Sequence, residues 1–403
     1  MNQSLSRRKR LGFGAMMVAL TIVLCAATLE FGLAMFMSPE QSANWTAFDA
    51  ERGWALIPGQ YTVKPMNGVR SFPLSINELG LRAHRPIEAT RIRRRLLVLG
   101  DSFTFAREVR TEGIFTQQLQ DLLVERGRRD VEVLNAGVPG YGTAQQLVLM
   151  QELLTKRRVM PELVLLVFFT NDILDNLCLS YGNLAPQPTR PCFGLQNDSL
   201  VLEHHPQKEF NPADDTLVAA PAARGLRSIA IGRALAEEWI QTHPTLIRLL
   251  GYIGIDATVP RLPGLLNGWY RDDVVTSGTK LTGALLRELQ RNAAEKGSSL
   301  IVTMVPSPFQ VYPATYIPLL ERSFSGNPMV SAFASDRLRP QRIVAQICRE
   351  ANIPFLDLMP IFDRNSNSSL FIPRDGHLTE SGHTLMGQSL VEFVLEYLPA
   401  GVG

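Results

Sequence analysis

The sequence lacks a strong excess of charge of either sign: its 403 residues include 40 Lys and Arg against 38 Asp and Glu, a formal net charge of +2. Nucleic-acid binding relies on a basic surface that neutralises phosphates, so the composition indicates no nucleic-acid partner. Internal repeats and low-complexity tracts are missing as well. The length allows one large domain or two ordinary ones.

Cysteine and histidine are also scarce, with 4 and 6 residues. No Cys/His spacing resembles a metal site, and we expect neither a metal nor a cofactor. Cys25 falls in an apolar run, and Cys348 lies in a helical pattern where a buried thiol is expected. Cys178 and Cys192 flank a polar, Pro-rich loop of 13 residues. In an oxidising compartment they form either a disulfide or two unpaired thiols.

One long apolar run is present, at the N-terminus. Leu11–Leu29 has 19 residues without a charge, close to the ~20 needed to span hydrocarbon as a helix. Four basic residues precede it, and no Lys or Arg follows before Arg52. The positive-inside rule then predicts a cytoplasmic basic tail at 1–10, a transmembrane anchor at 11–37 and the remainder in the periplasm. A cleaved signal peptide is the alternative, although its apolar core is usually ~7–15 residues.

The rest of the chain divides by its hydrophobic pattern. Residues 38–90 show little periodicity, and we expect them to lead into the domain across its surface. From 91 to 400, short apolar runs alternate with amphipathic helices, which predicts an α/β domain, a three-layer α/β/α sandwich with a central parallel sheet. The pattern breaks at about 178–272, which predicts an insertion. Strands are predicted at 96–100, 131–137, within 162–172, at 299–305 and at 353–358, and helices at 116–127, 143–157, 228–241, 280–297, 339–352 and 380–397.

Polar groups follow three of the predicted strands, where an open parallel sheet binds its ligands. They are Gly-Asp-Ser at 100–102, Asn-Ala-Gly-Val-Pro-Gly-Tyr-Gly at 135–142 and Thr-Asn-Asp at 170–172. A fourth group, Asp-Gly-His at 375–377, precedes the last helix. If the strands are neighbours, all four groups meet at one rim of the sheet.

Each group also has an ordinary structural interpretation. Ser102 is either a nucleophile or the cap of the helix that follows it. Asn171 and Asp172 suit an Asx turn, the glycines of the second group suit a tight turn, and His377 suits a solvated loop. The four groups together, in this order, are harder to explain in this way.

On these four groups the chain resembles the SGNH (GDSL-type) hydrolase superfamily, over roughly residues 75–178 and 280–397. The stretch Asn-Glu-Leu-Gly-Leu-Arg at 77–82 also looks like a lead-in of membrane-anchored bacterial members. Asp and His of the fourth group are separated by one residue rather than the usual two, which is similar to some polysaccharide O-acetyltransferase relatives. Phe169 stands where the family usually has a glycine.

The resemblance implies a serine hydrolase. Ser102 would be the nucleophile, His377 its general base, and Asp375 the acid that orients the imidazole. The backbone N–H groups of Ser102 and Gly140 and the side-chain amide of Asn171 would form the oxyanion hole.

Other polar residues are expected to have structural roles. His383 is the competing base, but its place in the first turn of the last helix favours packing. Asp101 and Asp172 are expected to stabilise turns. The remaining histidines are expected at the surface: His84, His204, His205 and His243. The basic cluster is expected to be a solvated strand entry, with a phosphate-bearing partner as the alternative: Arg91, Arg93, Arg94 and Arg95.

The sequence therefore predicts a serine esterase anchored in the inner membrane that acts on an acylated envelope glycoconjugate or polysaccharide. An O-acyltransferase is the alternative, since water and a sugar hydroxyl can accept the acyl group at the same triad. A catalytically silent scaffold in an envelope protein complex is a third interpretation, from a different class.

Overall fold

The computed structural model describes Thr21, Cys25, Thr28 and residues 45–63, 71–84, 94–181, 184–207, 263–373 and 375–400. The strands and helices below belong to the unit formed by residues 43–211 and 260–403. The predicted basic tail at 1–10, nearly all of the predicted anchor at 11–37 and the predicted helix at 228–241 lie outside the described residues. Within the described ranges, no helix combines the length and apolarity needed to cross a bilayer.

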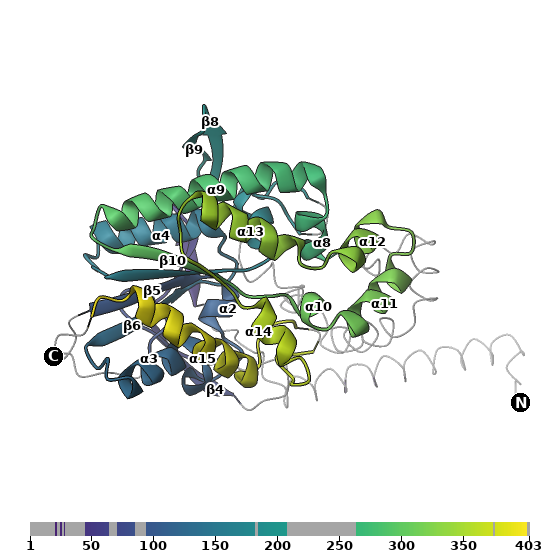
Figure 1. The fold of residues 1–403 in the computed structure, drawn as a ribbon. Coiled ribbons are helices and arrows are strands. Elements are labelled where there is room, and N and C mark those ends of the chain that lie inside the picture. The colour runs from purple at the N-terminus through teal and green to yellow at the C-terminus, as the bar shows by residue number, and fades with distance from the viewer. Residues whose placement is uncertain are drawn as a thin grey trace, which may run out of the picture. The chain divides into compact units, whose positions relative to one another are not determined.

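A five-stranded parallel sheet forms the centre, in the order β11-β10-β7-β5-β6 (Figure 1). The chain enters at β5 and then runs to β6 on one side and β7 on the other. Crossovers therefore leave β5 in opposite directions, and the switch point between the carboxyl ends of β5 and β7 is where such sheets bind ligands. The strands are β5 (Arg94–Gly100), β6 (Val131–Gly137), β7 (Leu163–Phe168), β10 (Ser299–Met304) and β11 (Phe355–Asp357).

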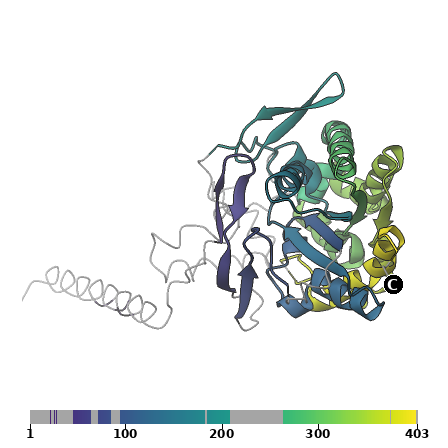
Figure 2. The same cartoon turned by 90° about the vertical axis from the view of Figure 1, so that its left-hand side faces the viewer.

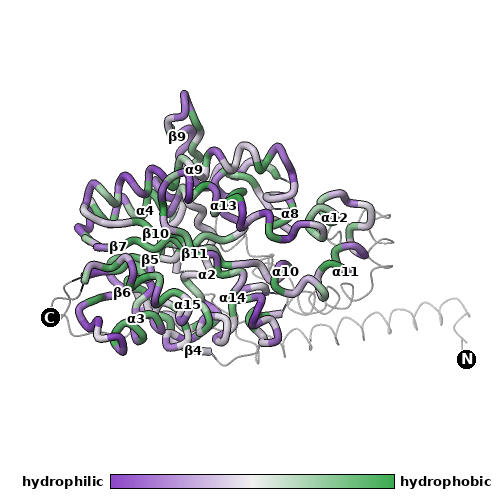
Figure 3. Tube along the Cα trace, in the orientation of Figure 1, coloured by the Kyte–Doolittle hydropathy of each residue, from purple (hydrophilic) through white to green (hydrophobic). Residues whose placement is uncertain are grey.

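Helices cover both faces of this sheet because its strands are apolar on both sides. In β5, Leu97 and Leu99 pack into one core cluster, and Leu96 and Val98 into a second cluster on the opposite face. This confirms the predicted three layers. Figure 3 shows the apolar strands between helices in which hydrophobic and hydrophilic residues alternate. One face carries α4 (Thr143–Thr155), α9 (Asp272–Ala294) and α13 (Arg339–Glu350), and the other α3 (Phe115–Glu125), α14 (Met359–Arg364) and α15 (Glu380–Tyr397).

The described part of the lead-in at 38–90 is more regular than its weak periodicity indicates, and it does not only cross the surface. Two antiparallel hairpins form there (Figure 2), and Trp54 and Leu74 are buried in the core. Each strand has only four or five residues, one with Pro73, so its alternation is too short to recognise. The strands are β1 (Thr46–Asp49), β2 (Gly53–Leu56), β3 (Gly59–Val63) and β4 (Phe72–Ile76).

The predicted insertion at 178–272 begins with a hairpin and ends earlier than expected. Strands β8 (Cys192–Gln196) and β9 (Ser199–His204) pair antiparallel and project over α9 (Figure 1). Helix α8 (Gly264–Trp269) is already part of the core, because Trp269 is buried and donates from Nε1 to Thr170 O at 2.6 Å. Helix α9 likewise begins at Asp272 rather than at 280.

Three short helices between β10 and α13 were not predicted. Each begins with proline, which suits the first helical turn because its missing N–H has no intrahelical partner there. They are α10 (Pro308–Val311), α11 (Pro313–Ser323) and α12 (Pro328–Ser335).

Candidate active site

The residue that caps the helix after β5 is Asp101, not Ser102. Its side chain accepts a hydrogen bond from Phe103 N at 2.9 Å, and Ser102 is the first residue of α2 (Ser102–Phe105). The interpretation of Ser102 as a helix cap is therefore wrong. Its Oγ instead lies 2.8 Å from Nε2 of His377.

The fourth motif forms one tight turn that supplies both an acid and a base. Asp375 Oδ1 lies 2.7 Å from Nδ1 of His377 and also accepts from the His377 backbone N–H at 3.0 Å. Gly376 adopts φ of +86°, a left-handed conformation that favours glycine, so a single residue suffices between the two. Both imidazole nitrogens are thus engaged, one by Asp375 and one by Ser102.

Electrostatics favour the protonated form of this imidazole. Burial alone lowers the pKa of His377, but the charge of Glu108 and the hydrogen bond and charge of Asp375 outweigh burial and raise it to about 9. Burial opposes ionisation of Asp375 too, yet the hydrogen bond from His377 keeps its pKa below the ordinary value. The arrangement can therefore take up a proton at Nε2 and hold the resulting charge.

Glu108 was not singled out from the sequence. It is buried, and its Oε1 lies 3.8 Å from His377 Nδ1. Glu108, Asp375 and His377 offer three ligating atoms within 4.8 Å of one another. Because both ring nitrogens already have partners, this geometry suits proton transfer better than metal binding.

Two of the three expected oxyanion donors have free hydrogen atoms in the described part of the chain. No described group accepts from the backbone N–H of Ser102 or of Gly140. Gly140 has φ of +78°, and a Cβ there would lie 3.2 Å from Cζ2 of Trp54, so the turn favours glycine. The indole of Trp54 supports this turn by donating to Pro139 O at 3.0 Å.

The side-chain amide of Asn171 is already engaged. Its Nδ2 donates to Asp175 Oδ2 at 2.9 Å and to Tyr181 OH at 3.1 Å. Its Oδ1 has no hydrogen-bond partner among the described residues. An oxyanion at Ser102 would have to draw one of these amide hydrogens away from its present partner.

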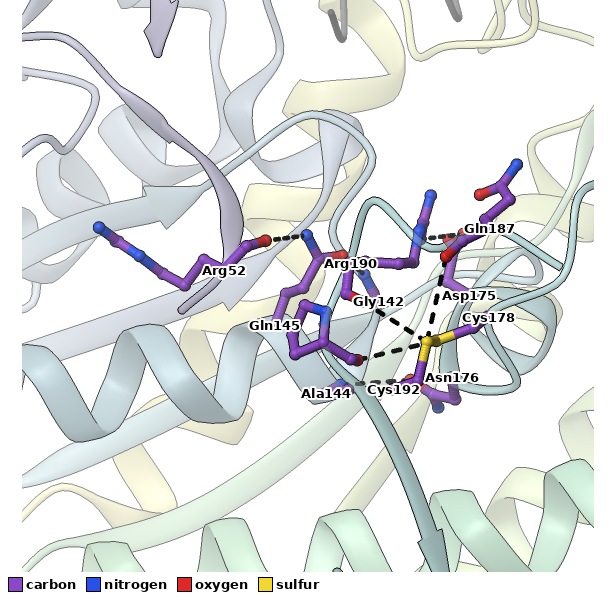
Figure 4. The surroundings of a disulfide bond; sticks show 11 residues. Arg52, Gly142, Ala144, Gln145, Asp175, Asn176, Cys178, Gln187, Arg190 and Cys192 are labelled. Carbon is purple, nitrogen blue, oxygen red and sulfur yellow. Dashed lines mark hydrogen bonds and ion pairs between the residues drawn. A yellow bond between two sulfur atoms is a disulfide. The ribbon is translucent and has the colours of Figure 1, made fainter. Parts of the chain in front are cut away.

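Asn171 belongs to a buried polar network that lies beside a disulfide. Asp175, in α5 (Asp172–Asn176), binds Tyr181 OH at 2.9 Å and forms an ion pair with Arg190. The disulfide joins Cys178 and Cys192, with Arg190 and Asp175 beside it (Figure 4). The alternative of two unpaired thiols is thus not what the structure shows.

Asp101 and Asp172 bind backbone amides, as expected of turn carboxylates. Asp172 accepts from Phe169 N at 2.8 Å. Burial raises the pKa of Asp101 to about 6, and burial, followed by the nearby Asp101 charge, raises the pKa of Asp172. Both carboxyls therefore hold a proton more readily than exposed carboxyls do.

Aromatic rings line one side of the triad. The ring of Phe103 lies 3.8 Å from that of Phe169 and 4.9 Å from that of His377, measured between centroids. Phe169, where the resembled family usually has a glycine, is therefore the outer member of a stack that ends at the imidazole.

His383 is a core residue and not a competing base. It is fully buried, stacks on Phe115 with an interplanar angle of 7°, and burial lowers its pKa to about 3. His84, predicted at the surface, is half-buried and bonds Thr116 Oγ1 at 2.9 Å. His204 and His205 are exposed as predicted, and His243 lies outside the described residues.

The basic strand entry is paired with acids. Arg94 forms an ion pair with Asp130 at 2.6 Å and Arg95 with Glu132 at 2.9 Å. Arg91 and Arg93 lie outside the described residues. Cys348 is buried, as predicted.

No protein-family model matches the chain, and no curated protein matches it. Among solved structures, TesA is similar at 14% identity and TM-score 0.38, covering 76% of this chain and 100% of TesA. A lipase/acylhydrolase from Enterococcus faecalis is similar at 13% identity and TM-score 0.37, covering 77% and 100%. A catalytic mutant of Axe2, an acetylxylan esterase from Geobacillus stearothermophilus, is similar at 15% identity and TM-score 0.36, covering 77% and 98%. All three TM-scores lie below 0.5, so these similarities support no statement about the reaction, which is inferred from the geometry of the site.

Proposed function

We propose that this protein is a serine esterase that hydrolyses acyl esters through Ser102, His377 and Asp375. The observation that carries the proposal is the unbroken hydrogen-bond chain from Asp375 Oδ1 through the imidazole to Ser102 Oγ, with distances of 2.7 and 2.8 Å. Ser102 and the Asp375–His377 turn lie far apart in the sequence, yet together they adopt the nucleophile–base–acid geometry that activates a hydroxyl.

The acylation step follows from this geometry. Nε2 of His377 takes the hydroxyl proton as Oγ of Ser102 bonds to the ester carbonyl carbon. Negative charge then develops on the carbonyl oxygen, and the N–H groups of Ser102 and Gly140, free within the described chain, are the donors available to stabilise it. When the intermediate collapses, His377 returns the proton to the departing alcohol, which leaves Ser102 acylated.

Deacylation repeats these roles with water. His377 removes a proton from water as the water oxygen attacks the acyl carbon, and then returns it to Ser102 Oγ as the acid leaves. A sugar hydroxyl in place of water would give an O-acyltransferase with the same residues. A silent scaffold is the weaker interpretation, because a domain without chemistry has no need of this chain of hydrogen bonds.

We further propose that the domain works in the periplasm, held to the inner membrane through residues 11–37, on an acylated polysaccharide or other envelope glycoconjugate. The disulfide between Cys178 and Cys192 supports an oxidising compartment. This location also underlies our proposals of a bulky envelope substrate and of partners in an envelope complex. The near-neutral charge underlies our proposal that the protein has no nucleic-acid partner.

The test is turnover of p-nitrophenyl acetate by the purified full-length chain, beside Ser102→Ala and His377→Ala. We expect both substitutions to abolish turnover and covalent labelling by a fluorophosphonate, because Ser102→Ala removes the nucleophile and His377→Ala removes the base that activates it. Ser331→Ala and His205→Ala are matched controls, since both residues are exposed far from the triad in sequence.

Equal inertness of the unaltered chain and the variants towards both reagents would contradict the esterase and favour the scaffold. If turnover is clear, mass spectrometry of products formed with an added oligosaccharide separates the two acceptors. Hydrolysis releases free acid, whereas transfer adds an acyl group to the sugar.

A further inference from the structure

A second carboxylate lies beside the imidazole of His377. Glu108 is only 8% exposed, and its Oε1 is 3.8 Å from Nδ1, the nitrogen that also meets Asp375. This Oε1 accepts from Nε of Arg107 at 2.9 Å, while Oε2 is buried with no hydrogen-bond partner in the described ranges. Burying a carboxylate costs free energy unless a positive charge compensates it. Arg107 only partly supplies that charge, since it contacts one of the two oxygens.

The turn that carries Glu108 is held by a buried arginine from the lead-in. The guanidinium of Arg82 donates to the carbonyl oxygens of Phe105, Ala106 and Val109, the last at 2.8 Å. A planar guanidinium presents its donors in a fixed fork, so three carbonyls bound to it have little freedom. The backbone that carries Glu108 is therefore held near the imidazole, and the Glu108 side chain is buried there.

We propose that Glu108 is a positioning residue that acts through His377, stabilising the imidazolium formed when His377 takes the proton of Ser102. The inference rests on the proposed function and deepens it. At 3.8 Å the contact is too long for a hydrogen bond, so Glu108 contributes its charge. It neither receives a proton nor forms a bond, and the tautomer of the imidazole is set by Asp375.

The charges around the ring agree with this division of roles. Burial lowers the pKa of His377, and the largest influence that raises it is the charge of Glu108, ahead of Asp375. An opposite charge within ~4–6 Å commonly moves a pKa by roughly 1–3 pH units. The charged or titratable groups that face the ring, its acid or Glu108 are Glu108, Asp375, Asp101, Arg107, His383 and the buried Arg82, whose positive charge also acts on Glu108.

The direct test is an NMR titration of His377 in the full-length chain, with its signal assigned by its loss in His377→Ala. We expect Glu108→Gln to lower the pKa of His377 by roughly 1 pH unit or more. Glu112→Gln is the matched control, because Glu112 is exposed in the next turn of the chain and should leave it unchanged. EDTA in the buffer keeps adventitious metal away from the carboxylates.

The second readout is the pH dependence of kcat/KM on p-nitrophenyl acetate. kcat/KM should rise with pH as His377 loses its proton and then reach a plateau. Glu108→Gln should shift this rise to lower pH and lower the plateau by roughly tenfold or more. The loss should shrink at acid pH, because more of the variant's imidazole is neutral there. A merely structural role would lower the rate by one factor at every pH and leave the limb in place.

A His377 pKa at or below 6.5 in the unaltered chain overturns the proposal, and that measurement needs no variant to fold. An unchanged pKa in a folded Glu108→Gln variant overturns it as well. Glu108→Asp keeps the charge and should retain part of the elevation. If the protein turns over no ester at all, the proposed function fails while the titration still reports on Glu108, so the two failures are distinguishable.

Discussion

Removing the disulfide between Cys178 and Cys192 is the perturbation whose magnitude follows most directly from the structure. Its two cysteines are 14 residues apart and enclose the loop that carries Arg190. Closing a loop of about 15 residues removes chain entropy from the unfolded state worth about 3 kcal/mol. Cys178→Ser/Cys192→Ser should therefore lower the free energy of unfolding by about 3 kcal/mol.

The effect on activity should be smaller. Arg190 and Asp175 are buried as an ion pair, and Tyr181 OH bonds the same carboxylate at 2.9 Å. These contacts hold Asp175, and through it the amide of Asn171, without help from the disulfide. We expect the double variant to keep its turnover of p-nitrophenyl acetate within about tenfold of the unaltered chain.

The assay is urea unfolding with and without reductant, beside the ester assay. Reductant should destabilise the unaltered chain to the level of the double variant and leave the double variant unchanged. Equal unfolding midpoints for oxidised and reduced protein would refute the reasoning. A loss of activity without a loss of stability would show instead that the disulfide positions the site rather than the fold.

Three further predictions follow from the site. Asn171→Ala should lower kcat by roughly 100- to 1000-fold if its amide turns to the oxyanion, and a loss under about tenfold would assign it to the buried network alone. Gly140→Ala should cost about 1–2 kcal/mol in urea unfolding, because φ is +78° there, and should impair turnover. The pKa of His383 is about 3 in the folded protein against an ordinary value of 6.5, so the unfolded chain binds its proton first and stability falls as pH drops from 6.5 towards 3. His383→Phe should flatten this acid limb by up to about 1.4 kcal/mol per pH unit, measured by unfolding at pH 7 and 4.5.

The sheet and the helices that cover it could be predicted because short apolar runs alternate with longer amphipathic helical patterns. The residues of β7 form a buried apolar run, and α15 spans Glu380–Tyr397 as its periodicity predicts. The position of the site followed as well, since polar groups after parallel strands share one rim. What the pattern could not decide was the helix cap, because Asp101 and Ser102 are both good caps and only the geometry distinguishes them.

Features that depend on contacts between distant segments could not be predicted from the sequence. The hairpin strands of the lead-in are too short for a recognisable alternation. The role of Arg82 can be seen only in the structure, where its guanidinium binds backbone carbonyls in the turn after α2. Glu108 lies next to Arg107 in a charged stretch that reads as solvent-exposed. Its burial and its position 3.8 Å from His377 arise from tertiary packing, and no local sequence pattern indicates either.

The acid and the base of this site form one local unit, whereas the nucleophile comes from elsewhere. Asp375 binds both the backbone N–H and the ring of His377, so that turn can form by itself. Its docking against α2 depends on the Ser102 hydrogen bond and on the ring of Phe103, 4.9 Å from the imidazole. The position of the Asp375–His377 turn relative to α2 is thus the part of the site most sensitive to packing. Substitutions that loosen Phe103 should therefore impair turnover without disturbing the Asp375–His377 pair.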